Sequence, residues 1–251
     1  MASIGIQIQS LSVSYAGRPA LRDVSLTMPA NQIFGIIGPA NSGKTTLLKC
    51  INRTIDFVGT AKVEGRVLVG DRDVRQWGNV YELRRRIGMV FPLPVGLPMS
   101  IYDNVAYGPR MAGLKRRGEL DGLVEKCLRQ AALWDEVKDR MNLLGTKLSG
   151  GQQQRLTLAR ALSLEPEVLC LDEFSIAIDP VTTMKIEEVL LELRREMTIV
   201  LVTNLVQQAR RLAQNTAFLN NSRLIEVGET KQMFTKPAES LTLDYVTGNI
   251  G

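Results

Sequence analysis

The chain lacks histidine altogether, contains three cysteines among its 251 residues and has no long apolar stretch. Without histidine, no imidazole is available at any catalytic position. Cys50, Cys127 and Cys170 have no metal-like spacing and sit among apolar neighbours, so we expect buried thiols in a reducing compartment. A bilayer-spanning helix needs about 18 or more apolar residues in a row, and no such run occurs. Residues 1–9 lack a basic region before an apolar run, so we expect no signal peptide and a cytosolic location.

Charge of one sign is also scarce, because the formal net charge is only +5. The two basic runs, Arg84–Arg86 and Lys115–Arg117, are short and lack interleaved aromatic residues. We therefore expect a solvated face, or one near an anionic membrane surface, and no nucleic-acid partner.

Short apolar runs of strand length recur and predict a buried sheet. They are apolar at nearly every position, which is typical of parallel strands covered by helices on both faces: Ile33–Ile37, Ile87–Phe91, Val168–Leu171 and Thr198–Thr203. Apolar residues at helical spacing, from Leu120 to Ala131 and from Ile186 to Met197, predict helices with one buried face. Residues 7–27 and 59–69 alternate like short antiparallel strands, and residues 98–160 are predicted to be mostly helical. These patterns predict an α/β core with an antiparallel β portion and an inserted helical lobe.

A phosphate-binding loop pattern follows the first buried run, in the strand–loop–helix context that this pattern requires. Backbone amides of such a loop and its helix face a phosphate group, a lysine reaches the β- and γ-phosphates, and a hydroxyl ligates magnesium. Asn41 stands where glycine is common, and asparagine tolerates positive φ better than most residues. We therefore predict binding of ATP or GTP with Mg²⁺ by Gly38, Pro39, Ala40, Asn41, Ser42, Gly43, Lys44, Thr45 and Thr46.

An acidic pair ends another buried run. Asp172 is placed to hold the magnesium shell together with Thr45, and the adjacent Glu173 to orient or deprotonate an attacking water. The alternative, an acidic pair that merely caps a helix, is weakened by the phosphate loop upstream and by the four apolar residues that precede the pair.

The segment Leu148–Arg155 resembles the signature of ABC-type ATPases, given the phosphate loop before it and the acidic pair after it. A serine and two glycines at a helix start leave amides and a hydroxyl free for an anion. The resemblance implies two ATP molecules held between two copies of the chain, each capped by the signature residues of the opposite copy: Ser149, Gly150, Gly151 and Gln152. An ordinary capped helix is the alternative.

The resemblance covers the full length and implies the fold of this family: a P-loop NTPase core with an antiparallel β subdomain and a helical subdomain. We expect one ABC domain over residues 1–251, with the core in 1–97 and 161–251 and the signature-bearing helical subdomain in 98–160. The resemblance also implies that Tyr15 stacks on adenine, although packing is an alternative role, and that Asp179 couples the two ATP sites.

Three further segments resemble the ATPases of phosphate importers: residues 91–108, 132–139 and 234–248. This likeness implies two transmembrane permease subunits as partners, an indirect link to an extracytoplasmic solute-binding protein and a peripheral position on the cytoplasmic face of the cell membrane. It also implies that segment 92–108 docks a membrane subunit. No residue chemistry in these segments recognises phosphate.

Three positions depart from the family pattern. Pro92 replaces a glutamine that reaches magnesium and water, Asn204 replaces a histidine that contacts the γ-phosphate, and Phe174 replaces a proline. Loss of one donor to transition-state charge typically costs about a hundred- to a thousandfold in rate. Asn204 retains an amide that can donate one hydrogen bond, and Glu173 is present. We expect firm ATP binding and slow hydrolysis, with Glu173 and Asn204 as catalytic residues.

Three alternatives stay open at this point. A degenerate regulatory subunit would open and close on ATP with little hydrolysis. An importer ATPase for another solute would have a different binding protein. A soluble ABC protein of DNA repair or translation is disfavoured, because such chains usually fuse two ATPase units or carry long inserts.

Overall fold

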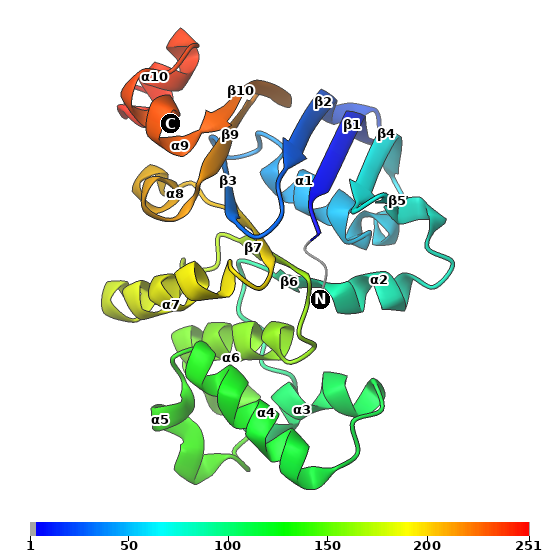
Figure 1. Cartoon of the computed structure of the whole chain (residues 1–251), viewed down its shortest axis with the longest axis vertical. Helices are drawn as coiled ribbons and strands as arrows, with labels where there is room; N and C mark the ends of the chain where they lie inside the picture. The colour runs from blue at the N-terminus through cyan, green and yellow to red at the C-terminus, as the bar shows by residue number, and fades with distance from the viewer. Residues whose placement is uncertain (1–3, 251) are drawn as a thin grey trace.

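A computed structural model describes residues 4–250, so residues 1–3 and 251 of the expected single domain lie outside the described part. Two sheets lie in the upper part of the molecule in Figure 1, and a group of helices lies below them. Among the described residues, no helix combines the length and the apolar character needed to cross a membrane.

The larger sheet has six strands in the order β10-β9-β3-β8-β7-β6. All of its neighbouring pairs are parallel except β9 with β10. Every residue of β3, β7 and β8 is buried, as the apolar runs predicted. The strands are β3 (Ile33–Ile37), β6 (Ile87–Val90), β7 (Val168–Asp172), β8 (Thr198–Val202), β9 (Asn215–Asn220) and β10 (Arg223–Glu229). Phe91, expected to continue the strand, lies outside β6, where its carbonyl accepts a hydrogen bond from Gln154 Nε2 (2.9 Å).

The smaller sheet is antiparallel, with the order β2-β1-β4-β5. Its strands are β1 (Ile6–Tyr15), β2 (Arg18–Met28), β4 (Ala61–Val69) and β5 (Arg72–Asp73). Two of them are longer than the short strands predicted from the alternation. The pairing of β1 with β2 shifts register at several points, with Ser10 and Asp23 at φ 47° and 48°. Such bulges bend a long ribbon while the pairing continues on either side.

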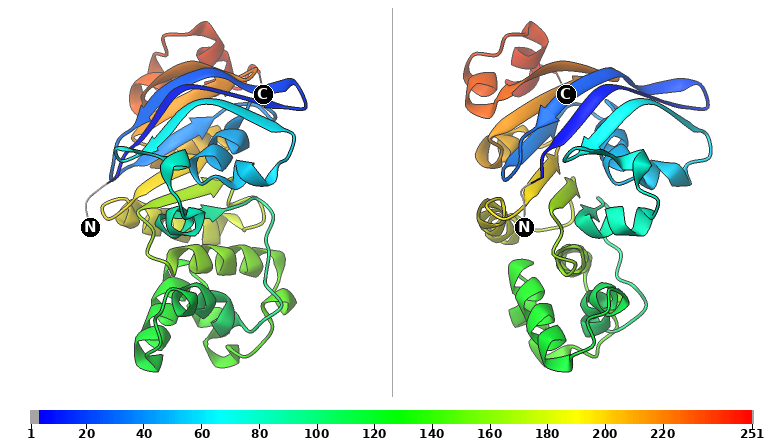
Figure 2. Two further views of the ribbon diagram at one scale, coloured as in Figure 1. Left: turned by 90° about the vertical axis from the view of Figure 1, so that its right-hand side faces the viewer. Right: turned by 45° about the vertical axis from the view of Figure 1, so that its right-hand side comes forward.

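Helix α1 (Lys44–Ile51) packs between the two sheets (Figure 2). Its Leu47, Leu48 and Ile51 are fully buried in one apolar cluster with residues of β1, β2, β3 and β4. The first turn of α1 is therefore held by core packing on both sides. The connections after α1 are two short 3₁₀ turns, Thr54–Phe57 and Val74–Gln76, and helix α2 (Val80–Arg86).

A helical lobe follows β6 in the chain and lies at the bottom of Figure 1. It is made by α3 (Ile101–Met111), α4 (Arg117–Gln130), α5 (Trp134–Val137) and α6 (Gly150–Leu162), with 3₁₀ turns at Lys138–Arg140 and Gly145–Lys147. As predicted, the buried side of α4 includes Leu120, Val124 and Leu128, although Ala131 lies just past the end of the helix. Residues 98–160 hold no strand, only an isolated bridge between Ser100 and Leu144.

The remaining helices belong to the core: α7 (Pro180–Leu193), α8 (Val206–Leu212), α9 (Thr230–Thr235) and α10 (Ser240–Val246). Met197 was expected on the apolar stripe of one helix, but α7 ends at Leu193 and Met197 is buried beyond it. A parallel core, an antiparallel portion and a helical lobe are thus all present, and the predicted fold class is confirmed.

Candidate nucleotide-binding site

Three predicted functional segments begin at the same edge of the larger sheet. Asp172 at the end of β7 pairs in register with Val202 of β8, and Val202 pairs with Ile36 of β3. The phosphate loop therefore leaves β3 beside the acidic pair after β7 and beside the turn after β8 that carries Asn204. The carboxyl edge of a parallel sheet is where ligands of open α/β folds bind.

The phosphate loop needs glycine at both ends. Gly38 has φ 152° and Gly43 has φ 106°. A Cβ on Gly38 would lie 2.1 Å from the Leu219 carbonyl oxygen, and one on Gly43 would lie 2.4 Å from that of Ala20. Any side chain at either position would collide with backbone. Between them Asn41 has φ 62°, the left-handed conformation that asparagine was predicted to allow.

Lys44 lies at the start of α1 and its side chain folds back over the loop. Its Nζ donates to the carbonyl oxygens of Gly38 at 2.7 Å and Pro39 at 2.8 Å. An ammonium group has three N–H donors, so one remains for a further acceptor. Burial lowers the pKa of Lys44, and the charges of Glu173 and Asp172 oppose that shift. Lys44 is therefore held at the loop, beside two carboxylates whose charges favour its ammonium form.

An open groove of about 650 Å³ lies along the loop. Most of the predicted phosphate-loop residues line it, together with three residues that the sequence did not suggest, Arg18, Pro19 and Ala20. The full lining is Tyr15, Arg18, Pro19, Ala20, Ala40, Asn41, Ser42, Gly43, Lys44, Thr45, Thr46 and Glu173. Arg18 follows the turn after Tyr15, the residue predicted to stack on adenine. This closeness in sequence was the one signal that could have placed Arg18 at the groove.

Tyr15 connects the antiparallel sheet to the groove. Its hydroxyl lies 3.2 Å from Thr46 Oγ1, and either oxygen can be the donor. Burial raises the pKa of Tyr15, and the bond to Thr46 opposes the shift. The ring is only half-buried and lines the groove, which fits both the predicted stacking role and packing against α1.

Asp172 is fully buried, and both carboxylate oxygens lack a hydrogen-bond partner within the described residues. Burial raises its pKa, and Glu173 adds to the shift, while Thr45, Lys44 and Lys49 oppose it. A buried carboxylate without donors calls for a ligand that supplies positive charge. Magnesium fits, because it takes few protein oxygens and completes its shell with water and nucleotide phosphates. The described residues hold no cluster of three or more His, Cys, Asp or Glu side chains that could bind a metal ion by themselves.

Of the two predicted catalytic residues, Glu173 directly follows this carboxylate, and Asn204 follows the neighbouring strand β8. Glu173 lines the groove with φ 46°, and its amide donates to the Val202 carbonyl at 2.9 Å. Asn204 is exposed in the turn after β8. Pro92 follows β6 next to an exposed Phe91, and Phe174 is buried in the core. Glu173 is thus at the loop, whereas Asn204 is not among the residues that line the groove.

The predicted signature residues lie elsewhere, at the start of α6. Ser149 is the N-cap: its Oγ accepts from the Gln152 amide at 3.4 Å, and its amide donates to Gln152 Oε1 at 3.1 Å. Gln152 also donates to Glu136 of α5 at 2.8 Å. None of Ser149, Gly150, Gly151 and Gln152 lines the groove of the same chain. The serine oxygen is an acceptor in this capping box, and its O–H group still has the capacity to donate to an anion.

Asp179 caps another helix. It is the N-cap of α7, where its Oδ1 accepts from the Thr182 amide at 2.9 Å, and this bond lowers its pKa. Behind it, Gln208 Nε2 donates to Ser175 Oγ at 3.2 Å and to Glu187 at 3.0 Å, which ties the loop before Asp179 to α8. Asp179 does not line the groove either.

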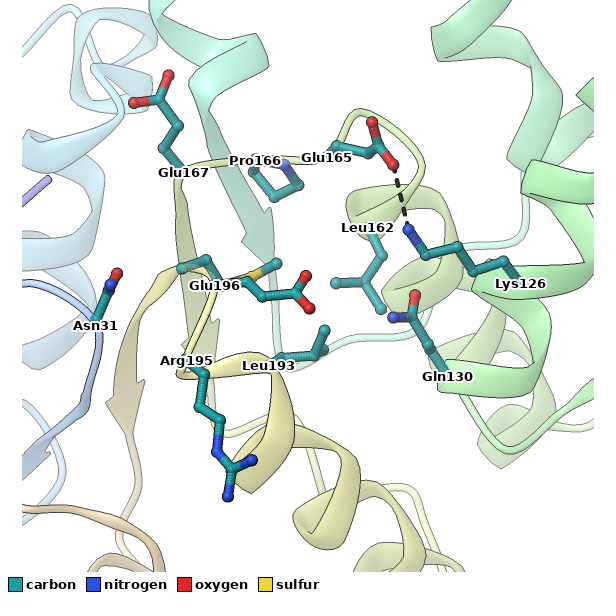
Figure 3. A pocket seen from close by; sticks show the side chains of 11 residues that line it. Asn31, Lys126, Gln130, Leu162, Glu165, Pro166, Glu167, Leu193, Arg195 and Glu196 are labelled. Atoms are coloured by element: carbon teal, nitrogen blue, oxygen red, sulfur yellow. Dashed lines mark hydrogen bonds and ion pairs between the residues drawn. The ribbon is translucent and has the colours of Figure 1, made fainter. Parts of the chain in front are cut away.

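A second pocket, of about 460 Å³, lies at the opposite edge of the sheet (Figure 3). It borders residues that come just before strands, including Asn31, Glu167 and Met197. Figure 3 shows Glu165 paired with Lys126, and Glu196 turned toward Leu162. The carboxylate of Glu196 has no ion-pair partner among the described residues, and the pocket has no glycine-rich loop. Both features make it a poor site for a nucleotide phosphate.

Comparison with known proteins identifies the class of this fold. The model of the ABC transporter family matches residues 21–175, which include the phosphate loop, the start of α6 and the acidic pair. The chain therefore belongs to the ABC transporter family. It carries the ATPase domain of that family, which binds and hydrolyses ATP.

Two solved structures are similar over most of the chain. One is a dimeric post-hydrolysis state of the ATP-binding cassette MJ0796 bound to ADP and Pi, with 26% identity over 90% of this chain and 98% of that chain, and a TM-score of 0.80. The other is a bacterial Atm1-family ABC exporter with ATP bound, with 23% identity, a TM-score of 0.85 and coverage of 98% of this chain. This chain spans only 42% of the exporter's length, so the likeness concerns its fold alone.

Proposed function

We propose that the protein is the ATP-hydrolysing subunit of an ABC importer, working as a homodimer on the cytoplasmic face of the cell membrane. The observation that carries this proposal is the alignment of Gly38–Lys44, Asp172 and Glu173 on neighbouring strand ends. A triphosphate bound there would meet the loop amides and Lys44, with Thr45 and Asp172 toward its magnesium. Residues 98–160 would serve as the helical subdomain, and residues 1–97 and 161–251 as the core.

Glu173 is the residue placed to act on water. It lines the groove beside Lys44, next to a carboxylate that is reserved for the metal. A carboxylate in this position can orient the attacking water or accept its proton, and the protein's other groups stabilise charge on the phosphoryl oxygens. ATP hydrolysis would follow when Ser149 of a second copy closes over the γ-phosphate.

The dimer is supported by the position of the signature residues and by the dimeric state of the similar cassette MJ0796. Ser149–Gln152 start a helix whose first amides have no intrahelical partner, and they lie outside the groove of their own chain. A second copy related by a two-fold axis would bring them to a phosphate loop. Asp179, in the loop after Glu173, would lie at this seam.

The test of the dimer uses Glu173→Gln, with Glu188→Gln on the exposed side of α7 as the matched control. With saturating ATP and magnesium, the first variant should stop turnover and shift from monomer to dimer in light scattering, while the control turns over like wild type. A Glu173→Gln protein that stays monomeric alone and beside its membrane partners would refute the proposal.

Transmembrane permease partners are proposed on the basis of exposed apolar residues along segment 91–111. Leu93, Val95, Tyr107 and Met111 are 76%, 52%, 49% and 63% exposed. Should these side chains form one patch, they would suit contact with another protein. Phosphate as the solute, and a binding protein outside the membrane, rest on the resemblance of three segments to phosphate importers.

The experiment that tests the partners is purification from membranes in mild detergent. Two permease subunits should accompany the chain, and ATP hydrolysis should rise with phosphate-loaded binding protein. Stimulation by another loaded binding protein would instead assign another solute. Changing Leu93 and Val95 to serine should uncouple transport and leave ATP binding intact.

A regulatory subunit with little hydrolysis is the second candidate, favoured by the exposed Asn204 and by Pro92, which has no side-chain donor. In that case Glu173→Gln would leave the already minimal nucleotide turnover unchanged. We expect slow but measurable turnover, because Glu173 retains its place in the groove.

A further inference from the structure

The C-terminal segment has no part in the chemistry proposed above, although it is folded against the core. We call helices α9 and α10, residues 230–246, the C-terminal cap. Tyr245 of α10 is only 4% exposed and stacks on Phe218 of β9, with ring centroids 4.8 Å apart and an angle of 17° between the rings. Stacked aromatic pairs contribute beyond the area they bury, so this contact fixes α10 on the sheet.

Phe218 leads from the cap to the phosphate loop. It pairs in register with Ile37, the last residue of β3 and the residue before Gly38. Ile37, Phe218, Met233 and Tyr245 form one buried apolar cluster. On the same strand, the Leu219 carbonyl is so close to Gly38 that no Cβ would fit between them. Strand β9 thus packs directly against the first residue of the loop, and Tyr245 packs against Phe218 of the same strand.

The phenol group of Tyr245 also lies near the first residue of the loop. Burial raises the pKa of Tyr245, and the nearby backbone of Gly38 lowers it in part. The charge of Glu173 acts in the same direction as burial. A neutral hydroxyl therefore lies beside the first residue of the phosphate loop.

Hydrogen bonds to strand β10 also hold the C-terminal cap in place. Glu226 of β10 accepts hydrogen bonds from the amides of Ala238 at 2.9 Å and Glu239 at 3.2 Å, immediately before α10 begins. The cluster beneath the cap also includes Ala209 of α8, the helix that starts two residues after Asn204. One small core therefore contacts both the phosphate loop and the element that follows Asn204.

We propose that Tyr245 is a positioning residue that fixes the junction of β3 and the phosphate loop, so that the C-terminal cap sets the affinity for nucleotide phosphates. The proposal rests on ATP binding at that loop. Neither Tyr245 nor the cap would touch the nucleotide. They would act by holding Ile37 and Gly38 where the loop amides converge.

The test compares full-length variants by titration calorimetry with ATP and magnesium and by amide hydrogen exchange without nucleotide. Tyr245→Phe keeps the ring on Phe218 and removes only the hydroxyl. It should weaken ATP binding about three- to tenfold, the range expected for loss of a polar contact to the Gly38 backbone. It should also speed exchange in peptides covering residues 37–44. Leu243→Ala, 47% exposed on the same helix, is the matched control and should match wild type in both.

A second variant loosens the cap without touching the loop. Glu226→Gln weakens the anchor of α10 and should raise exchange in residues 37–44 and weaken ATP binding in the same direction as Tyr245→Phe. It also covers the case in which a larger change at Tyr245 fails to fold.

Wild-type affinity and wild-type exchange in Tyr245→Phe would overturn the proposal. A lower melting temperature with unchanged affinity and loop exchange would overturn it as well, because that is what a purely structural residue would give. Failure of the wild-type chain to bind ATP would instead refute the proposed function, and loop exchange in Tyr245→Phe would still decide on Tyr245.

Discussion

Replacing Asp172 with asparagine should make the nucleotide-free protein more stable. The carboxylate is fully buried, and neither oxygen has a hydrogen-bond partner among the described residues. A buried polar group left without a partner costs about 1–3 kcal/mol. Asparagine is of similar size and removes the cost of the buried charge. It still leaves two polar atoms unpaired and loses the attraction of Lys44, so the expected net gain is only about 1 kcal/mol. For a domain of this size, that gain raises the melting temperature by about 2–4 °C.

The same substitution should remove the response to magnesium. At a free concentration one hundred times its dissociation constant, a ligand of the folded state adds about 2.7 kcal/mol. Wild type should show a larger thermal shift with ATP and magnesium than with ATP and a chelator. In Asp172→Asn the two shifts should be equal, because the carboxylate that faces the metal is gone.

The dependence on pH gives a further check. Since the pKa of Asp172 is raised in the folded state, the folded protein binds its proton more tightly than the unfolded chain does. The cost of the buried charge is therefore absent below the unfolded pKa of about 3.9 and grows as pH rises from there toward the folded pKa. The gain in melting temperature of Asp172→Asn should appear over that range and then level off. A nucleotide-free variant less stable than wild type at neutral pH, or one that still responds to magnesium, would refute the reasoning.

Two other substitutions test the loop and the missing histidine. Gly43→Ala would place a Cβ 2.4 Å from the Ala20 carbonyl oxygen at φ 106°, so the ATP affinity measured by calorimetry should fall at least about tenfold. Gly59→Ala is the control, because a Cβ there would have no atom within 4 Å, and it should bind ATP like wild type. Equal affinity of the two variants would show that the clash at Gly43 is relieved. Asn204→His should raise steady-state ATP turnover by about tenfold or more, because it restores a donor to the γ-phosphate; unchanged turnover would show that this position does not limit the rate.

The sequence predicted strands β3, β6, β7 and β8 well, and strands β9 and β10 poorly. Strands β3, β7 and β8 are apolar at every or nearly every position, which only a doubly covered strand requires, and they were predicted close to their observed bounds. Strand β9 has a short apolar stretch between polar ends, and edge strand β10 is half-exposed throughout. Strand β9 takes its place in the sheet by pairing with β3, which is distant in sequence, and β10 pairs only with β9.

The site was predictable where local geometry carries it. Gly38, Asn41 and Gly43 adopt the positive φ that their residue types allow, and the order of strand, loop and helix identified the loop. The place of Tyr245 could not be predicted in the same way. It lies near the loop through contacts between segments far apart in the chain, which spacing along the sequence does not encode.

Side chains of helix α6 hydrogen-bond to the backbone of residues 91–96, part of the segment with exposed apolar residues. Gln154 donates to the Phe91 carbonyl, Gln153 Oε1 accepts from the Gly96 amide at 3.0 Å, and Arg160 Nη1 donates to the Val95 carbonyl at 3.2 Å. An α-helix rises about 1.5 Å per residue and resists bending over so short a span. These contacts run from the first turns of α6 to its last turn, so a displacement of residues 91–96 would move the helix as one unit. Ser149, the N-cap of the same helix, would move with it.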